Sequence, residues 1–178
     1  MMELLAPAGG YEALIAAVQS GADAVYMGFG AFNARRSAKN FTDEEFASAV
    51  EYCHLRGVRV FLTLNTLLTD RELGKAAETL RKASDMGVDA VLVQDWGLLT
   101  LAQETVPDLP IHASTQMSLF TLGGAREAEK LGMERVVLAR ELSRDQVAEI
   151  CAGCGAEIEI FGHGALCMCY SGQCEMSA

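Results

Sequence analysis

The sequence predicts an α/β fold: a parallel (β/α) barrel of the TIM type that is incomplete, with about seven β-α units in one domain over residues 1–178. Short apolar runs alternate with amphipathic stretches along most of the 178 residues, as in βαβ units. The phrases Ser-Gly-Ala-Asp-Ala-Val at 20–25 and Met-Gly-Val-Asp-Ala-Val at 86–91 repeat one helix-to-strand junction. No Gly-x-Gly-x-x-Gly follows the first strand, which disfavours a doubly wound dinucleotide-binding sheet. A whole barrel takes eight units and about 250 residues, so the last part is expected to be missing.

The expected elements follow from the periodicity in chain order. Strands are expected at 4–6, 24–27, 59–64, 90–94, 111–114, 135–139 and 157–161. Helices are expected at 10–20, 43–56, 70–86, 96–105, 119–131 and 143–151. Thr42 and Ser143 are typical N-caps, because Glu or Gln follows three residues later. Gly21 and Gly87 stand where C-terminal glycines end helices.

Composition and charge limit the classes of function. The net charge of −10 argues against a broad nucleic-acid surface on this chain. RNA is not excluded as a substrate, because a missing C-terminal region would supply the basic surface. No apolar run reaches the ~18 residues of a membrane-spanning helix, and the first residues lack a secretory pattern. The expected location is the cytoplasm, where the six cysteines would be reduced thiols or metal ligands.

Polar residues collect where the predicted strands end, at the mouth that carries the active site in (β/α) barrels. The side chains expected to bind substrate there are Arg36, Asn40, Asn65, Asp95, Ser114 and Gln116. The loop at 33–40 holds Arg35 beside Arg36, and a bidentate arginine there would grip a phosphate or carboxylate. The alternative interpretation is that this loop is solvated and binds no ligand.

The seventh strand carries a second group of candidates. By period-two alternation, one face would present Glu157, Glu159, Phe161 and His163. Ile158 and Ile160 would then face the helices and turn Glu159 inward. A buried carboxylate needs a partner, for which Arg140 and Arg35 are the candidates. A catalytic mouth and a structural ion pair both remain open.

The six cysteines separate by their position along the predicted fold. Cys151 and Cys154 precede the seventh strand, whereas Cys167 and Cys174 follow it, about 20 Å away along the strand. The two pairs therefore are not expected to share one metal. Cys53 is expected to be buried packing. Cysteines as dense as Cys167, Cys169 and Cys174 usually hold a metal or cluster, and Cys169 is the weaker ligand of the three.

These residues resemble a known family. The pattern Glu-x-Phe-x-x-Gly-Ala-Leu-Cys-x-x-x-x-Gly-x-Cys-x-Met-Ser at 159–177 resembles the signature of peptidase family U32, the collagenase-like peptidases. The opening Glu-Leu-Leu-Ala-Pro-Ala-Gly at 3–9, the loop at 33–41 and His-Ala-Ser-Thr-Gln at 112–116 are similar too. The resemblance covers the whole chain.

The resemblance implies more than proteolysis. Some members take part in oxygen-independent hydroxylation of a transfer-RNA uridine, a ribosomal-RNA cytidine or ubiquinone, and hold a [4Fe–4S] cluster through four cysteines. Two of those ligands fall on Cys167 and Cys174, and the other two would lie past residue 178. The cluster is thus expected in the full-length protein and absent or incomplete in this portion.

Three functions follow as alternatives. In the first, an iron–sulfur protein hydroxylates RNA, with Glu159, His163, Arg35 and Arg140 at the catalytic mouth. In the second, a peptidase uses Cys167 or Ser171 as nucleophile and His163 as base. A metallopeptidase is disfavoured because no His-Glu-x-x-His is present. In the third, the chain is a non-enzymatic accessory subunit. A second copy is a further expected partner, covering the open sheet edge.

Overall fold

The computed structural model describes residues 2–29, 32, 41–164 and 168–173. Within these residues, seven parallel strands pair in sequence order and curl into a half-barrel. The strands are β1 (Leu5–Pro7), β2 (Ala24–Gly28), β3 (Arg59–Leu64), β4 (Ala90–Val93), β5 (Ile111–Ala113), β6 (Arg135–Val137) and β7 (Glu157–Glu159). The incomplete parallel (β/α) barrel is therefore confirmed.

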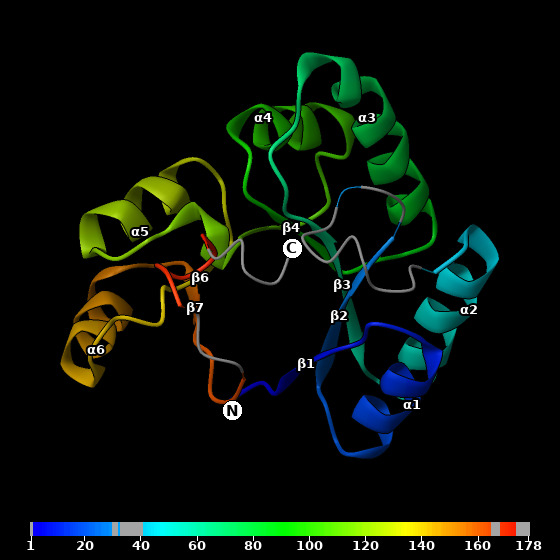
Figure 1. Cartoon of the computed structure of the whole chain (residues 1–178), viewed down its shortest axis with the longest axis horizontal. Coiled ribbons are helices and arrows are strands. Elements are labelled where there is room, and N and C mark those ends of the chain that lie inside the picture. Colours follow the sequence, from blue (N-terminus) through cyan, green and yellow to red (C-terminus); the bar gives the residue numbers. More distant parts are fainter. Residues whose placement is uncertain (1, 30–31, 33–40, 165–167, 174–178) are drawn as a thin grey trace.

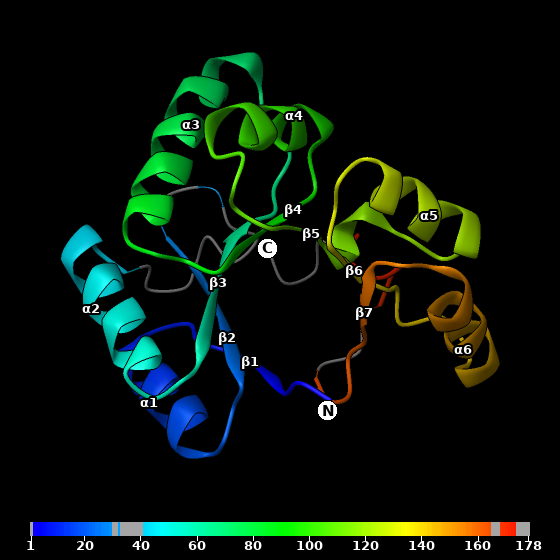
Figure 2. The ribbon, with the colours of Figure 1, turned by 180° about the vertical axis from the view of Figure 1, so that it is seen from behind.

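Six α-helices in the described residues lie around the outside of the curled sheet (Figure 1). They are α1 (Tyr11–Gln19), α2 (Asp43–His54), α3 (Asp70–Asp85), α4 (Trp96–Thr105), α5 (Leu122–Lys130) and α6 (Arg144–Gly153). The reverse view shows the same ring of helices, with the N-terminal end of the chain lying near the orange segment that follows β7 (Figure 2).

The predicted start signals form as capping boxes. The Thr42 hydroxyl accepts a hydrogen bond from Glu45 N, and the Glu45 carboxylate accepts one from Thr42 N. Ser143 and Gln146 make the same reciprocal pair at α6. Each box satisfies two backbone N–H groups that the first helical turn leaves without partners. The local sequence is thus enough to start these helices.

The repeated Gly-x-Asp-Ala-Val phrase has a structural reason. The Asp23 carboxylate accepts a hydrogen bond from Leu4 N at 2.8 Å, and the Asp89 carboxylate accepts one from Val60 N at 2.7 Å. Each aspartate therefore ties the start of its own strand to the preceding strand. The glycine before it, Gly21 or Gly87, takes a positive φ of 91° or 85°, a conformation that favours glycine.

Hydrophobic side chains form two layers because the strands are buried on both faces. The outer layer packs between sheet and helices and includes Val25, Leu62 and Val91. The inner layer fills the curl with Ala24, Phe61, Ala90, Leu92 and Val137. Alternate residues of each strand thus serve different cores, as in a closed barrel.

Most element boundaries differ from the prediction by one or two residues, and two of the differences have a clear structural cause. The stretch expected to be helical from 119 begins only at Leu122, because Thr115–Met117 forms a 3₁₀ turn and Ser118 has φ 54°. The seventh strand ends at Glu159, and Ile160, predicted to face the helices, is 58% exposed. In the described residues β7 pairs on one side only, so no second strand holds the backbone beyond Glu159.

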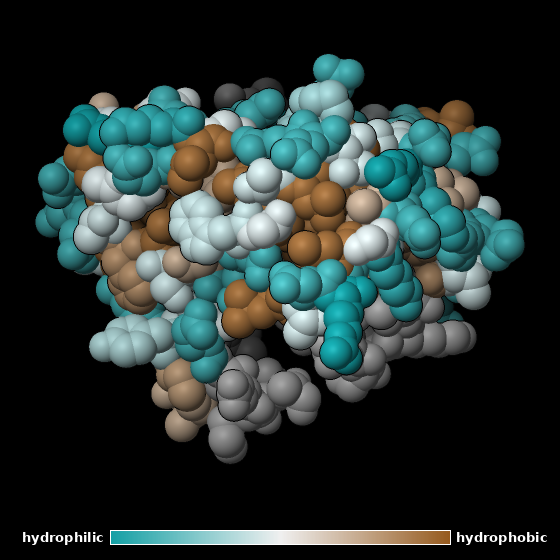
Figure 3. Space-filling view, turned by 90° about the horizontal axis from the view of Figure 1, so that it is seen from above, coloured by the Kyte–Doolittle hydropathy of each residue, from teal (hydrophilic) through white to brown (hydrophobic). Residues whose placement is uncertain are grey.

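The face that lies over α3 and α4 is mainly polar (Figure 3). Seen from above, over α3 and α4, hydrophilic side chains predominate and apolar ones show between them (Figure 3). No helix among the described residues has the length and apolar character needed to cross a membrane.

Candidate functional site

A chain of side-chain hydrogen bonds joins the ends of β3 and β5 at the mouth of the half-barrel. Asn65 Nδ2 donates to Ser114 Oγ at 3.3 Å, and Ser114 Oγ donates to Gln116 Oε1 at 3.2 Å. Ser114 is buried, whereas Asn65 and Gln116 are half-buried. Three of the predicted substrate-binding residues therefore lie together, on the loops that follow β3 and β5.

The segment 168–173 lies against the loops after β5 and β6 and is held there through Ser171 and Gln173. Gln173 Nε2 donates to the Gln116 carbonyl at 2.9 Å. Ser171 is 1% exposed; its hydroxyl oxygen accepts from Arg140 N at 2.9 Å and its N–H donates to Glu141 Oε1 at 2.7 Å. The part of the cysteine-rich segment that the structure describes is therefore fixed to the loops after β5 and β6.

Gly172 allows this close approach. Its φ is +79°, and a Cβ at this position would lie 2.5 Å from Gln116 Cα. A side chain here would both strain the backbone and collide with the turn after β5. The glycine of the Gly-x-Cys signature thus lets the segment lie against the barrel.

Arg140 and Phe161 meet at the ends of β6 and β7. The Arg140 guanidinium lies 3.9 Å from the centre of the Phe161 ring, a cation–π distance. His163, two residues beyond, is exposed. Arg140 therefore lies beside the segment that follows β7.

Asp95 has a structural role at this mouth. Its Oδ1 accepts from Leu98 N at 2.9 Å, which caps α4, and its Oδ2 accepts from Leu68 N at 3.3 Å. The carboxylate thus ties the loop after β3 to the start of α4.

Glu159 pairs with a different residue from those expected. Its carboxylate lies 3.5 Å from Arg135 Nη1, so the partner in the described residues is Arg135 of β6 rather than Arg140. Burial raises the pKa of Glu159, and the Arg135 charge opposes that rise. Glu157 shares this face of β7, as predicted, and accepts from Arg135 Nε at 2.8 Å.

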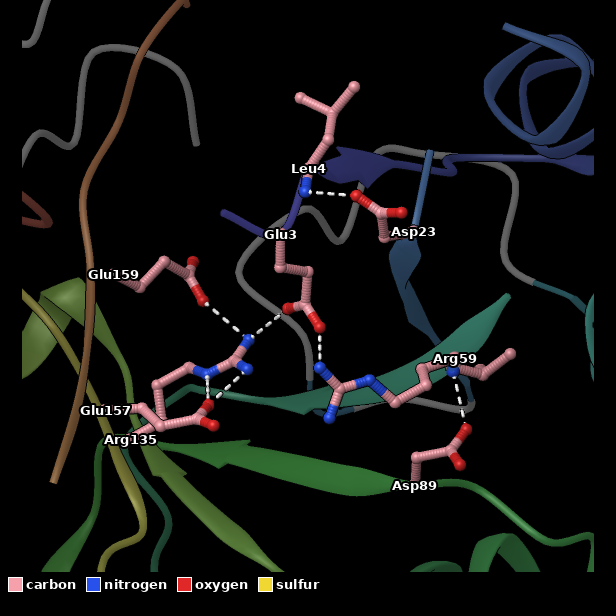
Figure 4. A network of polar contacts seen from close by, with 9 residues as sticks. Glu3, Leu4, Asp23, Arg59, Asp89, Arg135, Glu157 and Glu159 are labelled. Atoms are coloured by element: carbon pink, nitrogen blue, oxygen red, sulfur yellow. Dashed lines mark hydrogen bonds and ion pairs between the residues drawn. The ribbon is translucent and has the colours of Figure 1, made fainter. Parts of the chain in front are cut away.

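Arg135 is the centre of a network at the end of the half-barrel opposite the mouth (Figure 4). It also donates to Glu3 at 2.6 Å, and Glu3 contacts Arg59 at the start of β3. Arg135 is a residue of this network that the sequence pattern did not predict. The signal was an arginine opening an apolar strand, in register with Glu157 on the next strand.

His112 lies inside the barrel beside this network. It is 4% exposed, and its ring packs edge-on against Phe61 with centroids 4.9 Å apart. Burial, with the charges of Arg135 and Arg59, lowers the pKa of His112 to about 3. Its Nδ1 is buried and has no hydrogen-bond partner among the described residues. The imidazole is therefore neutral near pH 7.

The cysteines fall as the topology predicted where the structure describes them. Cys53 is fully buried, and burial raises the pKa of its thiol to about 11, which suits packing. Cys151 is exposed in the last turn of α6, and Cys154 ends that helix before β7. No group of three or more potential metal ligands occurs in the described part of the chain.

Several predicted site residues lie outside the described residues. They are Arg35, Arg36, Asn40, Cys167 and Cys174. Cys167 directly precedes the segment 168–173 in the sequence, and Cys174 directly follows it.

Curated relatives match almost the whole chain. A 23S rRNA 5-hydroxycytidine synthase of Escherichia coli is 43% identical over 99% of the chain and 26% of its own length. A tRNA hydroxylation protein of Bacillus subtilis is 37% identical over 98% of the chain and 42% of its own length. A collagenase of Porphyromonas gingivalis is 37% identical over 98% of the chain and 44% of its own length. The chain thus spans less than half of each of these relatives.

Solved structures share the fold. A U32 peptidase, Mk0906, superposes with a TM-score of 0.75 at 20% identity, covering 90% of this chain and 68% of that one. A thiamine phosphate pyrophosphorylase from Pyrococcus furiosus gives a TM-score of 0.61 at 18% identity, covering 91% and 75%. The family model of peptidase family U32 matches residues 9–178. With a match over nearly its full length, the chain belongs to peptidase family U32.

Proposed function

We propose that this chain is the barrel portion of a protein that hydroxylates RNA and that works in the cytoplasm. The observation that carries the proposal is the 43% identity, over 176 residues, to a protein named a ribosomal-RNA hydroxycytidine synthase. Further relatives are named tRNA hydroxylation proteins. The chain supplies the mouth in which the target base would lie, lined by Asn65, Ser114 and Gln116.

The proposed cofactor is a [4Fe–4S] cluster in the full-length protein, with Cys167 and Cys174 as two of its ligands. Thiolates are the usual ligands of such clusters, so the donor chemistry fits, and a cubane takes four. The remaining ligands would come from beyond the residues of this chain. When bound, the cluster would supply electron transfer.

This chain's own residues would position that chemistry. Ser171 and Gln173 hold the segment between the two cysteines against the loops after β5 and β6. Arg140, stacked on Phe161, would place a positive charge at the mouth's edge. Glu159 would act from inside the barrel, through Arg135, to hold the shape of the β6–β7 edge.

The experiment combines a chemical and a cellular measurement. We expect about four irons and four acid-labile sulfides per chain in the full-length protein purified without oxygen. We also expect a strain that lacks the gene to lose one hydroxylated nucleoside from its tRNA or rRNA, measured by mass spectrometry of nuclease digests. Full nucleoside content in that strain would overturn the proposal.

Proteolysis is the second candidate, because one relative is named a collagenase and another an uncharacterized protease. The structure speaks against Ser171 as the nucleophile, since it is 1% exposed and its oxygen accepts a backbone hydrogen bond. Cys167 remains the nucleophile to test. Covalent trapping of Cys167 by a peptide-based electrophile, with no iron in the protein, would favour this candidate.

A second copy of the chain is the proposed partner at the sheet edges. In the described residues β1 and β7 each pair on one side only. Backbone groups on such edges readily pair with another strand. A monomer by light scattering would contradict this partner.

A further inference from the structure

We propose that the rim of the barrel mouth binds unstacked bases of single-stranded RNA by stacking on Trp96 and Tyr170. The inference rests on the proposed function and adds to it the way in which the substrate is recognised. It assigns a role to two exposed aromatic residues that the predicted site did not include.

Trp96 stands on the rim above β4. It is the first residue of α4, three residues after β4 ends, and it is 57% exposed. The Asp95 carboxylate, which binds both Leu98 N and Leu68 N, fixes the backbone beside it. Leu67, in the loop thus tied to Asp95, is 69% exposed. A large apolar surface is therefore held in place at this point and left open to solvent.

Tyr170 stands on the rim above β5. It is 69% exposed, and its ring lies edge-on to Phe120 with centroids 5.9 Å apart. The next residue, Ser171, is buried and hydrogen-bonded, so the backbone that carries the ring is anchored. One edge of the tyrosine ring is thus supported by protein while most of its surface stays exposed.

A third flat group continues the rim above β6 and β7. The Arg140 guanidinium stacks over the Phe161 ring at 3.9 Å. Guanidinium planes, like aromatic rings, are surfaces on which unpaired bases stack. The flat groups therefore follow consecutive strands from β4 to β7 around one side of the mouth.

The charge of the chain favours bases over phosphates as the groups recognised. With a net charge of −10, the chain as a whole attracts a phosphate backbone poorly, so we expect contacts to the bases to supply much of the affinity at this rim. Stacking supplies such contacts and accepts any base. In a duplex each base face is covered by the neighbouring base pair, so a paired RNA has no free base faces to stack on Trp96 and Tyr170. The hydrogen-bonded amides of Asn65 and Gln116, deeper in the mouth, would meet the edge of a base that enters.

The chain offers a direct probe, because Trp96 is its only tryptophan. We expect a single-stranded RNA of about 10 nucleotides to quench the Trp96 fluorescence in a saturable way. The same RNA annealed to its complement, and an abasic ribose-phosphate of equal length, should quench far less. Trp96→Ala and Tyr170→Ala should each weaken binding of the single strand, measured by anisotropy of a labelled RNA, by roughly 5- to 150-fold. Trp96→Phe, which keeps an aromatic ring, should lose less RNA affinity than Trp96→Ala.

Leu55→Ala is the matched control. Leu55 is 77% exposed but follows α2, at the opposite end of the barrel from the mouth, so its loss should not change RNA affinity. The ratio of the affinities of the parent and Trp96→Ala should also stay constant as salt rises, because stacking releases no counterions.

The outcomes separate this inference from the proposed function. If both alanine variants bind RNA as the parent does, while the cell still needs the protein for its hydroxylated nucleoside, only the stacking rim is overturned. Equal quenching by duplex or abasic RNA would overturn the rim as well. Quenching by a collagen peptide, with no RNA bound and no nucleoside lost, would overturn both.

Discussion

Glu3 and Arg135 form an ion pair at 2.6 Å although 132 positions separate them in the sequence. Glu3 lies two residues before β1, and Arg135 opens β6. The pair therefore joins the two ends of the curled sheet, across the side on which β1 and β7 are not paired with each other. Arg135 is almost fully enclosed, with 6% of its side chain exposed, and it also contacts Glu157 and Glu159.

Removing Arg135 should therefore destabilise the whole barrel. We expect Arg135→Ala to lower the free energy of unfolding by about 3–5 kcal/mol, because it leaves enclosed carboxylates without their cation. Urea denaturation measures the change. Lys130→Ala is the control, since it removes an exposed pair with Glu127 and should leave the midpoint unchanged. Equal midpoints for the two variants would show that the network does not hold the barrel together.

The buried His112 should make stability fall in acid. Its pKa in the folded protein is about 3, below the ordinary 6.5, so the unfolded chain binds the proton more readily. Stability is therefore complete above pH 6.5 and declines as pH falls toward 3, by up to about 1.4 kcal/mol per pH unit. The raised pKa of Glu159 has the opposite effect on stability. Its carboxylate takes up a proton more readily in the folded protein than in the unfolded chain, which favours folding as pH falls.

The His112→Gln variant isolates this contribution. It should show a flatter dependence of unfolding free energy on pH between 6.5 and 3 than the parent, measured by urea titration at each pH. If the two slopes agree, then His112 does not carry the acid sensitivity.

A methyl group at Gly172 should loosen the segment 168–173 from the loops after β5 and β6. Gly172→Ala would place a Cβ 2.5 Å from Gln116 Cα and force a non-glycine residue to a φ of +79°. We expect faster hydrogen exchange in residues 168–173 and a lower melting temperature. Gly162→Ala is the matched control, because no atom lies within 4 Å of its added Cβ. Unchanged exchange in Gly172→Ala would mean that the segment is not held against Gln116.

The cysteines at the two ends of the barrel should differ in their effect on iron. In the full-length protein, Cys174→Ala is expected to abolish the visible absorbance of the cluster. Cys151→Ala is expected to leave it intact, because Cys151 is exposed in the last turn of α6, before β7 begins. The absorbance spectrum and iron content of anaerobically purified protein test both. Iron lost on changing Cys151 would contradict the separation of the two ends.

The fold class followed from the sequence because its signals are local. Alternating apolar and amphipathic stretches, the capping boxes at Thr42 and Ser143 and the repeated Gly-x-Asp phrase each act over a few residues. The strands lie close to where the pattern put them, and the main error, at the start of α5, came from a 3₁₀ turn that no periodicity marks. The grouping of Asn65, Ser114 and Gln116 also followed, because strand ends in a parallel barrel meet at one mouth.

The tertiary structure decided the partners of the buried charges. Alternation along β7 was enough to predict that Glu159 turns inward. Its pairing with Arg135 depends on the register of β6 against β7. Whether Glu3 reaches Arg135 depends on how far the sheet curls, which sums the twist of all seven strands. The sequence by itself therefore determined the elements, their order and the family, because these depend on short-range patterns. Which enclosed side chains meet, and which aromatic rings stay exposed at the rim, depended on packing between residues far apart in the chain.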